Sequence, residues 1–112
     1  MQNLSSQELK VKIDAGQAVT IIDLQSPEIY AHRHIPGASH MEASSTCGEE
    51  CMRLLRDKDA EIVLYGEFDE LGKGAFVAEG LAAAGYLHVF RLVGGMMGWM
   101  EQGYAVEGGN ES

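Results

Sequence analysis

The chain has 112 residues, which is room for one domain with one hydrophobic core. Its 46% hydrophobic and 22% charged content is typical of a folded protein rather than a disordered one. Seventeen acidic residues against eight basic ones give a formal charge of −9, which argues against nucleic acid and anionic membranes as partners. No apolar stretch is long enough to span a bilayer, and the first four residues lack a signal-peptide pattern, so we expect a cytoplasmic protein.

The first third of the chain predicts an alternation of helices and strands. Ser5 and Glu8 match a capping box, so a helix is expected to begin there. The apolar run at residues 18–24 is typical of a strand that is covered on both faces. A serine followed by a proline predicts the start of a short helix at residues 26–33, and a short strand follows at residues 39–41.

The same alternation continues to the C-terminus. A second capping box predicts a helix at residues 46–55, and a buried strand follows at residues 61–65. Residues 73–84 have the apolar spacing of a helix, residues 88–92 read as a strand, and residues 96–102 read as a closing helix. Alternating strands and helices at short spacing indicate an α/β domain with a mostly parallel sheet.

In such sheets, ligands bind at the carboxyl ends of the strands. Asp23 ends one predicted strand, the segment 41–47 follows another, and the loop at residues 66–72 follows a third. Gly94 and Gly95 form a turn after the last predicted strand. We therefore expect these segments to share one face of the molecule.

Two separated stretches of sequence resemble the rhodanese-like family. The first is the run Asp-Leu-Gln-Ser-Pro-Glu-Ile-Tyr-Ala-His-Arg-His-Ile-Pro-Gly-Ala at residues 23–38, and the second is the ordered set of motifs at residues 83–106. The positions that match the family's structural motif are Asp23, Tyr30, His34, Pro36, Gly37, Gly94 and Gly95. The resemblance implies an α/β fold with a mostly parallel five-stranded sheet flanked by helices on both faces. It also implies one domain over residues 1–106. Residues 107–112 are polar and glycine-rich, so we expect them to form a flexible acidic tail.

The resemblance further implies sulfur transfer through a cysteine at the start of the loop that follows the strand at residues 61–65. In this chain that position is Gly66, and glycine has no atom that could carry sulfur. The family generally has arginine where this chain has Gln25. The whole loop departs from the family pattern and consists of Gly66, Glu67, Phe68, Asp69, Glu70, Leu71 and Gly72.

The charge of this loop also disfavours the family's common donor, thiosulfate, which is a dianion. Each of the three loop carboxylates repels it by up to about 1 kcal/mol at contact in water. Lys73 is the only cation that the sequence places beside the loop. We therefore predict a rhodanese-like domain that does not catalyse thiosulfate sulfur transfer and acts as a binding or regulatory module. Its protein partner would bind through the loop at residues 66–72, with Phe68 as the anchor.

An alternative uses the two cysteines. Cys47 and Cys51 are four residues apart and would share one face of the predicted helix at residues 46–55, near its N-terminus, where a thiol pKa is lowered. Glu49 and Glu50 oppose that effect. A sulfurtransferase or thiol-redox protein with Cys47 or Cys51 as sulfur acceptor therefore remains the alternative, and whether the protein is an enzyme is left open. A third reading is an inactive copy that supports another rhodanese domain, and the oligomeric state is not predicted.

Metal and cofactor sites are not expected. His32, His34 and His40 could be combined with the cysteines into a zinc site, but their spacing is irregular and no C-x-x-C pair is present. The histidine of the family's turn can instead bond local backbone. We predict no metal and no cofactor.

Overall fold

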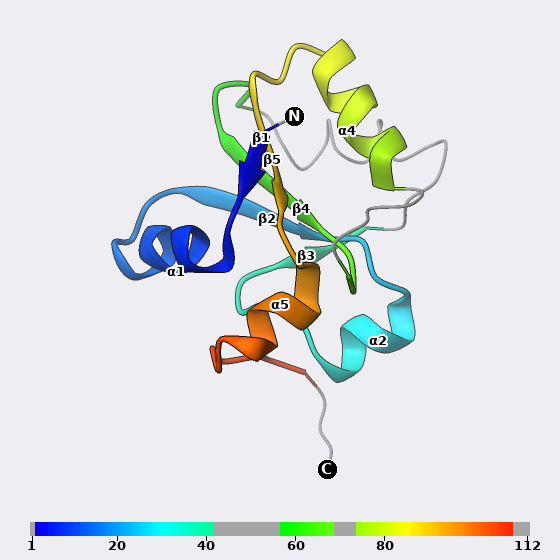
Figure 1. Cartoon of the computed structure of the whole chain (residues 1–112). Coiled ribbons are helices and arrows are strands. Elements are labelled where there is room, and N and C mark those ends of the chain that lie inside the picture. The colour runs from blue at the N-terminus through cyan, green and yellow to red at the C-terminus, as the bar shows by residue number, and fades with distance from the viewer. Residues whose placement is uncertain (1, 42–56, 69–73, 109–112) are drawn as a thin grey trace.

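A five-stranded sheet, in which every pair of neighbouring strands is parallel, forms the centre of the molecule (Figure 1). The computed structural model describes residues 2–41, 57–68 and 74–108. The strand order is β1-β5-β4-β2-β3, so β4 lies in the middle. The strands are β1 (Gln2–Leu4), β2 (Val19–Asp23), β3 (Ser39–His40), β4 (Glu61–Tyr65) and β5 (His88–Leu92).

Four helices occur in the described residues, and their positions follow the predicted order. They are α1 (Ser6–Asp14), α2 (Pro27–His32), α4 (Gly74–Ala83) and α5 (Gly95–Glu101). The capping box is confirmed, because Glu8 N–H donates to Ser5 Oγ at 3.0 Å and Ser5 N–H donates to Glu8 Oε1 at 2.9 Å. The helix that we predicted at residues 46–55 lies outside the described residues.

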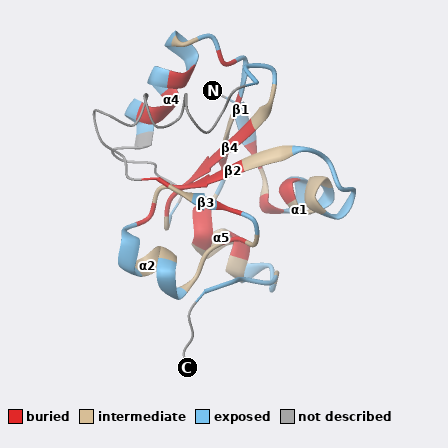
Figure 2. Ribbon diagram, turned by 180° about the vertical axis from the view of Figure 1, so that it is seen from behind, coloured by how far each residue is buried: buried red, intermediate tan, exposed pale blue. Residues whose placement is uncertain are grey.

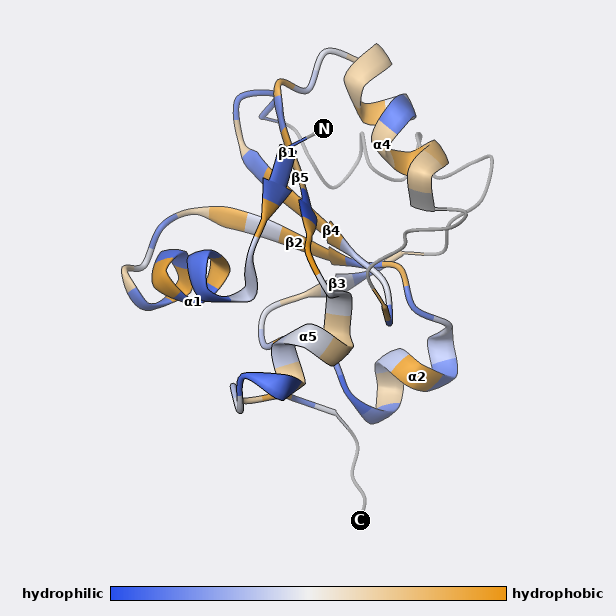
Figure 3. Cartoon of the chain, in the orientation of Figure 1, coloured by the Kyte–Doolittle hydropathy of each residue, from blue (hydrophilic) through white to orange (hydrophobic). Residues whose placement is uncertain are grey.

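The two faces of the sheet carry separate hydrophobic cores. Side chains alternate along a strand, so Ile62 and Leu64 of β4 pack with α4, whereas Val63 and Tyr65 pack with α1 and α5 on the opposite face. Figure 2 shows that buried residues are concentrated in the central strands, and Figure 3 shows that β2 and β4 are mostly apolar along their length. Helices on both faces explain why these strands read as continuous apolar runs. The predicted fold class is confirmed.

One strand was not predicted. β1 has only three residues, and its first two are exposed and polar, so the sequence carries no strand pattern there. It forms because Gln2, Asn3 and Leu4 pair in register with Phe90, Arg91 and Leu92 of β5. The strand therefore depends on its partner rather than on its own composition.

The C-terminal segment turns back onto α2. Glu107 and His34 exchange two backbone hydrogen bonds, with N···O distances of 2.7 Å and 2.9 Å. Gly108 lies directly against His32, because a Cβ on it would be 2.2 Å from the His32 carbonyl oxygen. Two residues of the segment that we predicted as a flexible tail thus make specific contacts, and residues 109–112 lie outside the described part. No helix among the described residues is long and apolar enough to cross a membrane.

Candidate functional site

The carboxyl ends of β2, β3 and β4 meet at one edge of the sheet, as predicted for a parallel arrangement. Leu24 N–H, just after β2, donates to the Tyr65 carbonyl at 2.8 Å. Met41 N–H, just after β3, donates to the Asp23 carbonyl at 3.0 Å. The segments that follow these strands therefore begin side by side, and α2 and α5 lie at the same end of the sheet (Figure 1).

A buried polar network lies under this edge and is centred on Asp23, which is fully buried. Its Oδ1 accepts the Gln25 backbone N–H at 2.7 Å, and its Oδ2 accepts the Gln25 side-chain Nε2–H at 2.8 Å. Tyr65 O–H also donates to Asp23 Oδ2, at 2.5 Å, and the same hydroxyl oxygen accepts from Ile35 N–H at 3.0 Å. This network joins β2, β4 and the turn after α2 into one unit.

Burial raises the pKa of the Tyr65 hydroxyl far above its usual range, and the nearby Asp23 carboxyl raises it further. The hydroxyl therefore keeps its proton and serves as a donor to Asp23. Because it makes a hydrogen bond at each side, its role is to position the turn at Ile35 rather than to react.

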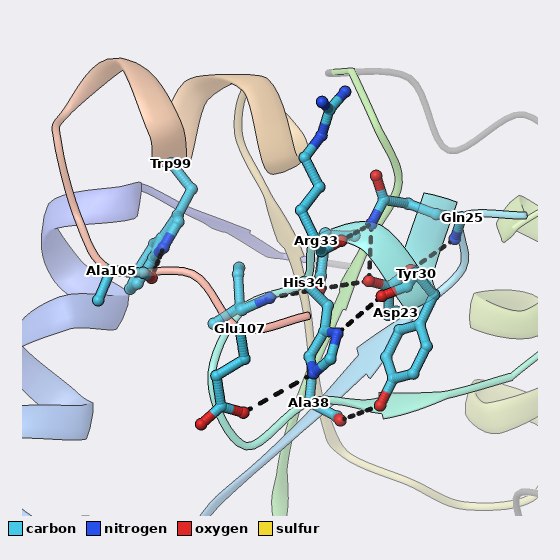
Figure 4. A network of polar contacts seen from close by, with 11 residues as sticks. Asp23, Gln25, Tyr30, Arg33, His34, Ala38, Trp99, Ala105 and Glu107 are labelled. Carbon is cyan, nitrogen blue, oxygen red and sulfur yellow. Dashed lines mark hydrogen bonds and ion pairs between the residues drawn. The ribbon is translucent and has the colours of Figure 1, made fainter. Parts of the chain in front are cut away.

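Tyr30, His34 and His40 form a stack beside the network. Figure 4 shows the Tyr30 and His34 side chains of this stack. The Tyr30 and His34 rings are 4.0 Å apart and nearly parallel, at 13°, and the Tyr30 and His40 centroids are 4.9 Å apart. Tyr30 O–H donates to the Ala38 carbonyl at 3.0 Å, and His34 Nδ1 lies 2.8 Å from the Tyr30 carbonyl, to which it donates. Burial raises the pKa of Tyr30, and the carboxylates of Asp23 and Glu107 raise it further. These side chains bond local backbone, as predicted for His34.

Pro36 and Gly37 of the motif shape the turn between α2 and β3. Pro36 is half-buried, and Gly37 has φ of 86°, a left-handed conformation that favours glycine. Asp23, Tyr30, His34, Pro36 and Gly37 thus come together around α2 and the turn that follows it.

Gly66 is buried and comes directly after β4. Its carbonyl accepts the Met96 N–H at 2.9 Å, and the Glu67 carbonyl accepts the Met97 N–H at 2.9 Å. Two amides in the first turn of α5 are therefore taken by the backbone of residues 66–67, and they hold the start of the loop against the helix.

Gly95 lies in contact with the backbone of residues 66–68. A Cβ on Gly95 would be 2.2 Å from the Phe68 carbonyl oxygen and 2.6 Å from the Gly66 carbonyl oxygen. Gly94 serves as the N-cap of α5 with φ of 81°. The predicted proximity of Gly94, Gly95 and the start of the loop is confirmed.

Among the residues that the structure describes, Arg33 is a cation that contacts the loop, and the sequence did not predict this contact. Its Nη2 donates to Glu67 Oε2 at 3.3 Å. Lys73, which we had expected to be the only nearby cation, lies outside the described residues. Only the strand order could have indicated this contact. Arg33 lies beyond β2 and Glu67 beyond β4, and these two strands are neighbours in the sheet although they are far apart in the sequence.

Several predicted site residues lie outside the described part of the chain. They are Cys47, Cys51, Asp69, Glu70, Leu71 and Gly72. Of the loop, Gly66, Glu67 and Phe68 are described, and Phe68 is 59% exposed. No group of three or more His, Cys, Asp or Glu side chains within residues 2–41, 57–68 and 74–108 could hold a metal ion.

The sheet order and its helical layers define an α/β domain whose candidate site lies at the carboxyl edge of a parallel sheet. The rhodanese-like domain family matches residues 5–102, and the chain belongs to this family. The family inferred from the two sequence motifs is therefore confirmed.

Solved structures agree with this assignment. The Alr3790 protein from Anabaena sp. is 29% identical, with a TM-score of 0.82 over 94% of this chain and 82% of that chain. The BH2092 protein from Bacillus halodurans is 24% identical, with a TM-score of 0.83 over 96% of this chain and 77% of that chain. A thiosulfate sulfurtransferase from Pseudomonas aeruginosa has the same fold, with 21% identity and a TM-score of 0.82 over 98% of this chain but only 21% of its own length.

Proposed function

We propose that this rhodanese-like domain does not catalyse thiosulfate sulfur transfer and acts as a binding or regulatory module through residues 66–72. The observation that carries the proposal is Gly66, which is the first residue after β4 and has no side chain that could become a persulfide. The family's chemistry requires a thiolate at that point of the loop.

The surroundings of Gly66 support the same conclusion. The Met96 and Met97 amides, which face the loop, donate to backbone carbonyls at 2.9 Å, so these donors are already used. The Glu67 carboxylate engages Arg33, which reduces the positive charge available to a thiosulfate dianion. A site with this composition suits recognition better than sulfur transfer.

Thiosulfate:cyanide sulfurtransferase activity tests the catalytic half of the proposal. We expect no turnover above the uncatalysed rate in the unmodified protein, with a cysteine-containing rhodanese as the positive control. Robust turnover would overturn the proposal, and its loss in Cys47→Ser or Cys51→Ser would establish the alternative, a thiol acceptor at one of these two positions.

A direct test of that alternative is mass spectrometry after exposure to a sulfane donor. The proposal expects no stable addition of one sulfur atom to either cysteine.

A cytoplasmic, reducing location is part of the proposal, because two cysteines do not provide a disulfide framework.

Phe68 is the proposed anchor for the partner. It is 59% exposed although Gly66, two residues earlier, is buried, so an aromatic side chain projects from a fixed backbone. Exposed aromatic residues are common anchors of protein interfaces. Phe76 on α4 is 70% exposed and provides a matched control at another surface.

A further inference from the structure

We infer that the partner of this site is cationic: a lysine- or arginine-bearing segment whose positive charge replaces Arg33 on Glu67, beside Phe68. This inference rests on the proposed binding function and specifies the chemistry of the partner. In the free protein, Arg33 would occupy the position on Glu67 that a basic side chain of the partner takes when it binds.

The internal ion pair is incomplete. Only Nη2 of Arg33 reaches Glu67, at 3.3 Å, although Nε and Nη2 of an arginine form a parallel pair of donors that suits both oxygens of a carboxylate. The Arg33 Nε is buried and has no hydrogen-bond partner among the described residues. The two side chains are about one third exposed, at 37% and 31%. Such a contact is weak enough for a better-placed cation to replace it.

An unused acceptor lies next to this pair. Gln25 Nε2 donates to Asp23 Oδ2 at 2.8 Å and to the Arg33 carbonyl at 3.3 Å. Both of these atoms are acceptors, which fixes the orientation of the amide and turns Oε1 away from Asp23. Gln25 is only 5% exposed, and its Oε1 has no partner within the described part of the chain.

The Gln25 oxygen and the Arg33 side chain extend to the same side of the network (Figure 4). An ammonium or guanidinium group carries several donors and no acceptor, so it could bond the partly exposed Glu67 carboxylate, whereas the Gln25 oxygen is buried and must first be exposed.

The apolar part of the site is Phe68. Its side chain is 59% exposed and follows Glu67 directly, so an acid and an aromatic ring are adjacent on the surface. A cation can contact both, through an ion pair and through the face of the ring. The backbone of residues 66–67 is fixed by the Met96 and Met97 amides, which lowers the ordering cost of binding.

The charge of the whole chain favours the same kind of partner. A formal charge of −9 attracts basic segments and repels acidic ones over the range of the Debye length. An anion would have to displace Glu67 from Arg33 against this field. The cationic partner is the occupant that both the local and the global charge support.

The test is an NMR titration of the isotopically labelled protein at low salt with a short synthetic peptide of alternating lysine and leucine. The same peptide with glutamate in place of lysine is the charge control. We expect the lysine peptide to shift the amide signals of Arg33, Glu67 and Phe68, to bind more weakly as salt is added, and to bind more tightly than the glutamate peptide.

Three variants locate the effect. Arg33→Gln removes the internal competitor and should tighten binding about two- to fivefold, whereas Glu67→Gln should weaken it by a similar factor. Glu79→Gln removes the same charge from the exposed face of α4 and should change the affinity by less than about twofold. Thermal unfolding of each variant checks that the fold is intact.

The outcomes separate this inference from the proposed function. Tighter binding of the glutamate peptide, or weaker binding by Arg33→Gln, would overturn the cationic partner. If Phe68→Ala weakens binding while Phe76→Ala does not, the binding function stands even when Arg33→Gln has no effect, and only the inference fails. Signal shifts confined to other surfaces would contradict both.

Discussion

Two polar regions at the same edge of the sheet differ in how completely their groups are bonded. In the network around Asp23, both carboxylate oxygens and the Tyr65 hydroxyl are used and the participating side chains are buried, with the Gln25 Oε1 as the exception that has no partner among the described residues. In the region around Glu67, one ion pair of 3.3 Å joins two partly exposed side chains, and a neighbouring aromatic ring projects outward. The first region fixes the backbone, and the second leaves groups available for a partner.

This difference separates the scaffold from the site. The motif residues Asp23, Tyr30 and His34 bond to the chain's own backbone and to each other, so they are expected to affect stability. Arg33 and Glu67 make one contact between them that other groups could replace, so they are expected to affect binding. Substitutions in the two regions should therefore have separable effects.

The largest loss of stability is expected for Asp23→Ala. The change removes the acceptor for three donors, namely Gln25 N–H, Gln25 Nε2–H and Tyr65 O–H, all within a buried network. Leaving such donors unpaired should lower the free energy of unfolding by about 3 to 5 kcal/mol, measured by urea denaturation. Asp14→Ala is the matched control, because the Asp14 carboxylate pairs with Lys10 on the surface. Its removal should lower the free energy of unfolding by less than about 1 kcal/mol. Equal losses in the two variants would contradict the comparison.

The next largest effect is expected for Gly95→Ala, which tests the contact between α5 and residues 66–68. The added Cβ would be 2.2 Å from the Phe68 carbonyl oxygen, and φ at this glycine is 59°. Steric overlap and backbone strain together should cost about 3 kcal/mol and shift the amide signals of Glu67 and Phe68.

Gly103→Ala separates the two causes of that loss. Gly103 has φ of 77°, but a Cβ there meets nothing within 4 Å. In this variant only backbone strain should lower the free energy of unfolding, by about 1 kcal/mol, measured by the same urea denaturation. If Gly95→Ala costs no more than Gly103→Ala, the contact with residues 66–68 is not a close one.

Most of the fold could be predicted from the sequence because the central strands are buried on both faces. The apolar runs that became β2 and β4, and the capping box at Ser5, carry their signals locally. β1 could not be predicted, since a strand of three residues depends on its pairing with β5.

The site was only partly predictable for a related reason. Asp23 ends β2, and Gly66 and Gly95 come after β4 and β5, so their proximity follows from the parallel sheet alone. Arg33 and Glu67 are 34 residues apart, and their contact requires the strand order and the end of α2 to be known. Cys47 and Cys51 remain predictions, because they lie outside the described residues.

A smaller, pH-dependent effect is expected for Tyr65→Phe. At neutral pH the change leaves Ile35 N–H without its acceptor and should cost about 1 to 2 kcal/mol. Burial and Asp23 raise the pKa of Tyr65 in the folded protein above the unfolded value of about 10. The stability from the protonated hydroxyl is thus fully present below about pH 10 and is lost as pH rises further.

Tyr65→Phe has no hydroxyl, so its stability cannot fall through ionisation at this position. Above about pH 10 the unmodified protein should lose stability faster than the variant, by up to about 1.4 kcal/mol per pH unit, so the gap between them narrows. Urea denaturation of both proteins at several pH values from neutral to alkaline measures this gap. A gap that stays constant or widens above pH 10 would show that Tyr65 ionises at least as readily in the folded protein as in the unfolded chain.

The smallest effect on global stability is expected for Gly108→Ala, although its contact is as close as that of Gly95. A Cβ on Gly108 would be 2.2 Å from the His32 carbonyl oxygen, with φ of 149°. Gly95 is held by α5 on one side and by residues 66–68 on the other, whereas Gly108 follows Glu107, whose two backbone hydrogen bonds to His34 can break without disturbing the sheet. The variant should therefore lose less than about 1 kcal/mol in urea denaturation.

Local opening should appear instead in hydrogen exchange. The His34 amide donates to the Glu107 carbonyl at 2.7 Å, so undocking of the tail exposes it to solvent and should speed its exchange. The Tyr30 amide, which donates to the Ser26 carbonyl within α2 at 2.9 Å, is the internal control and should keep its rate. If both amides exchange faster, the tail stabilises α2 itself. Faster exchange of His34 alone would place the docked tail outside the cooperative unit that Asp23 and Gly95 hold together.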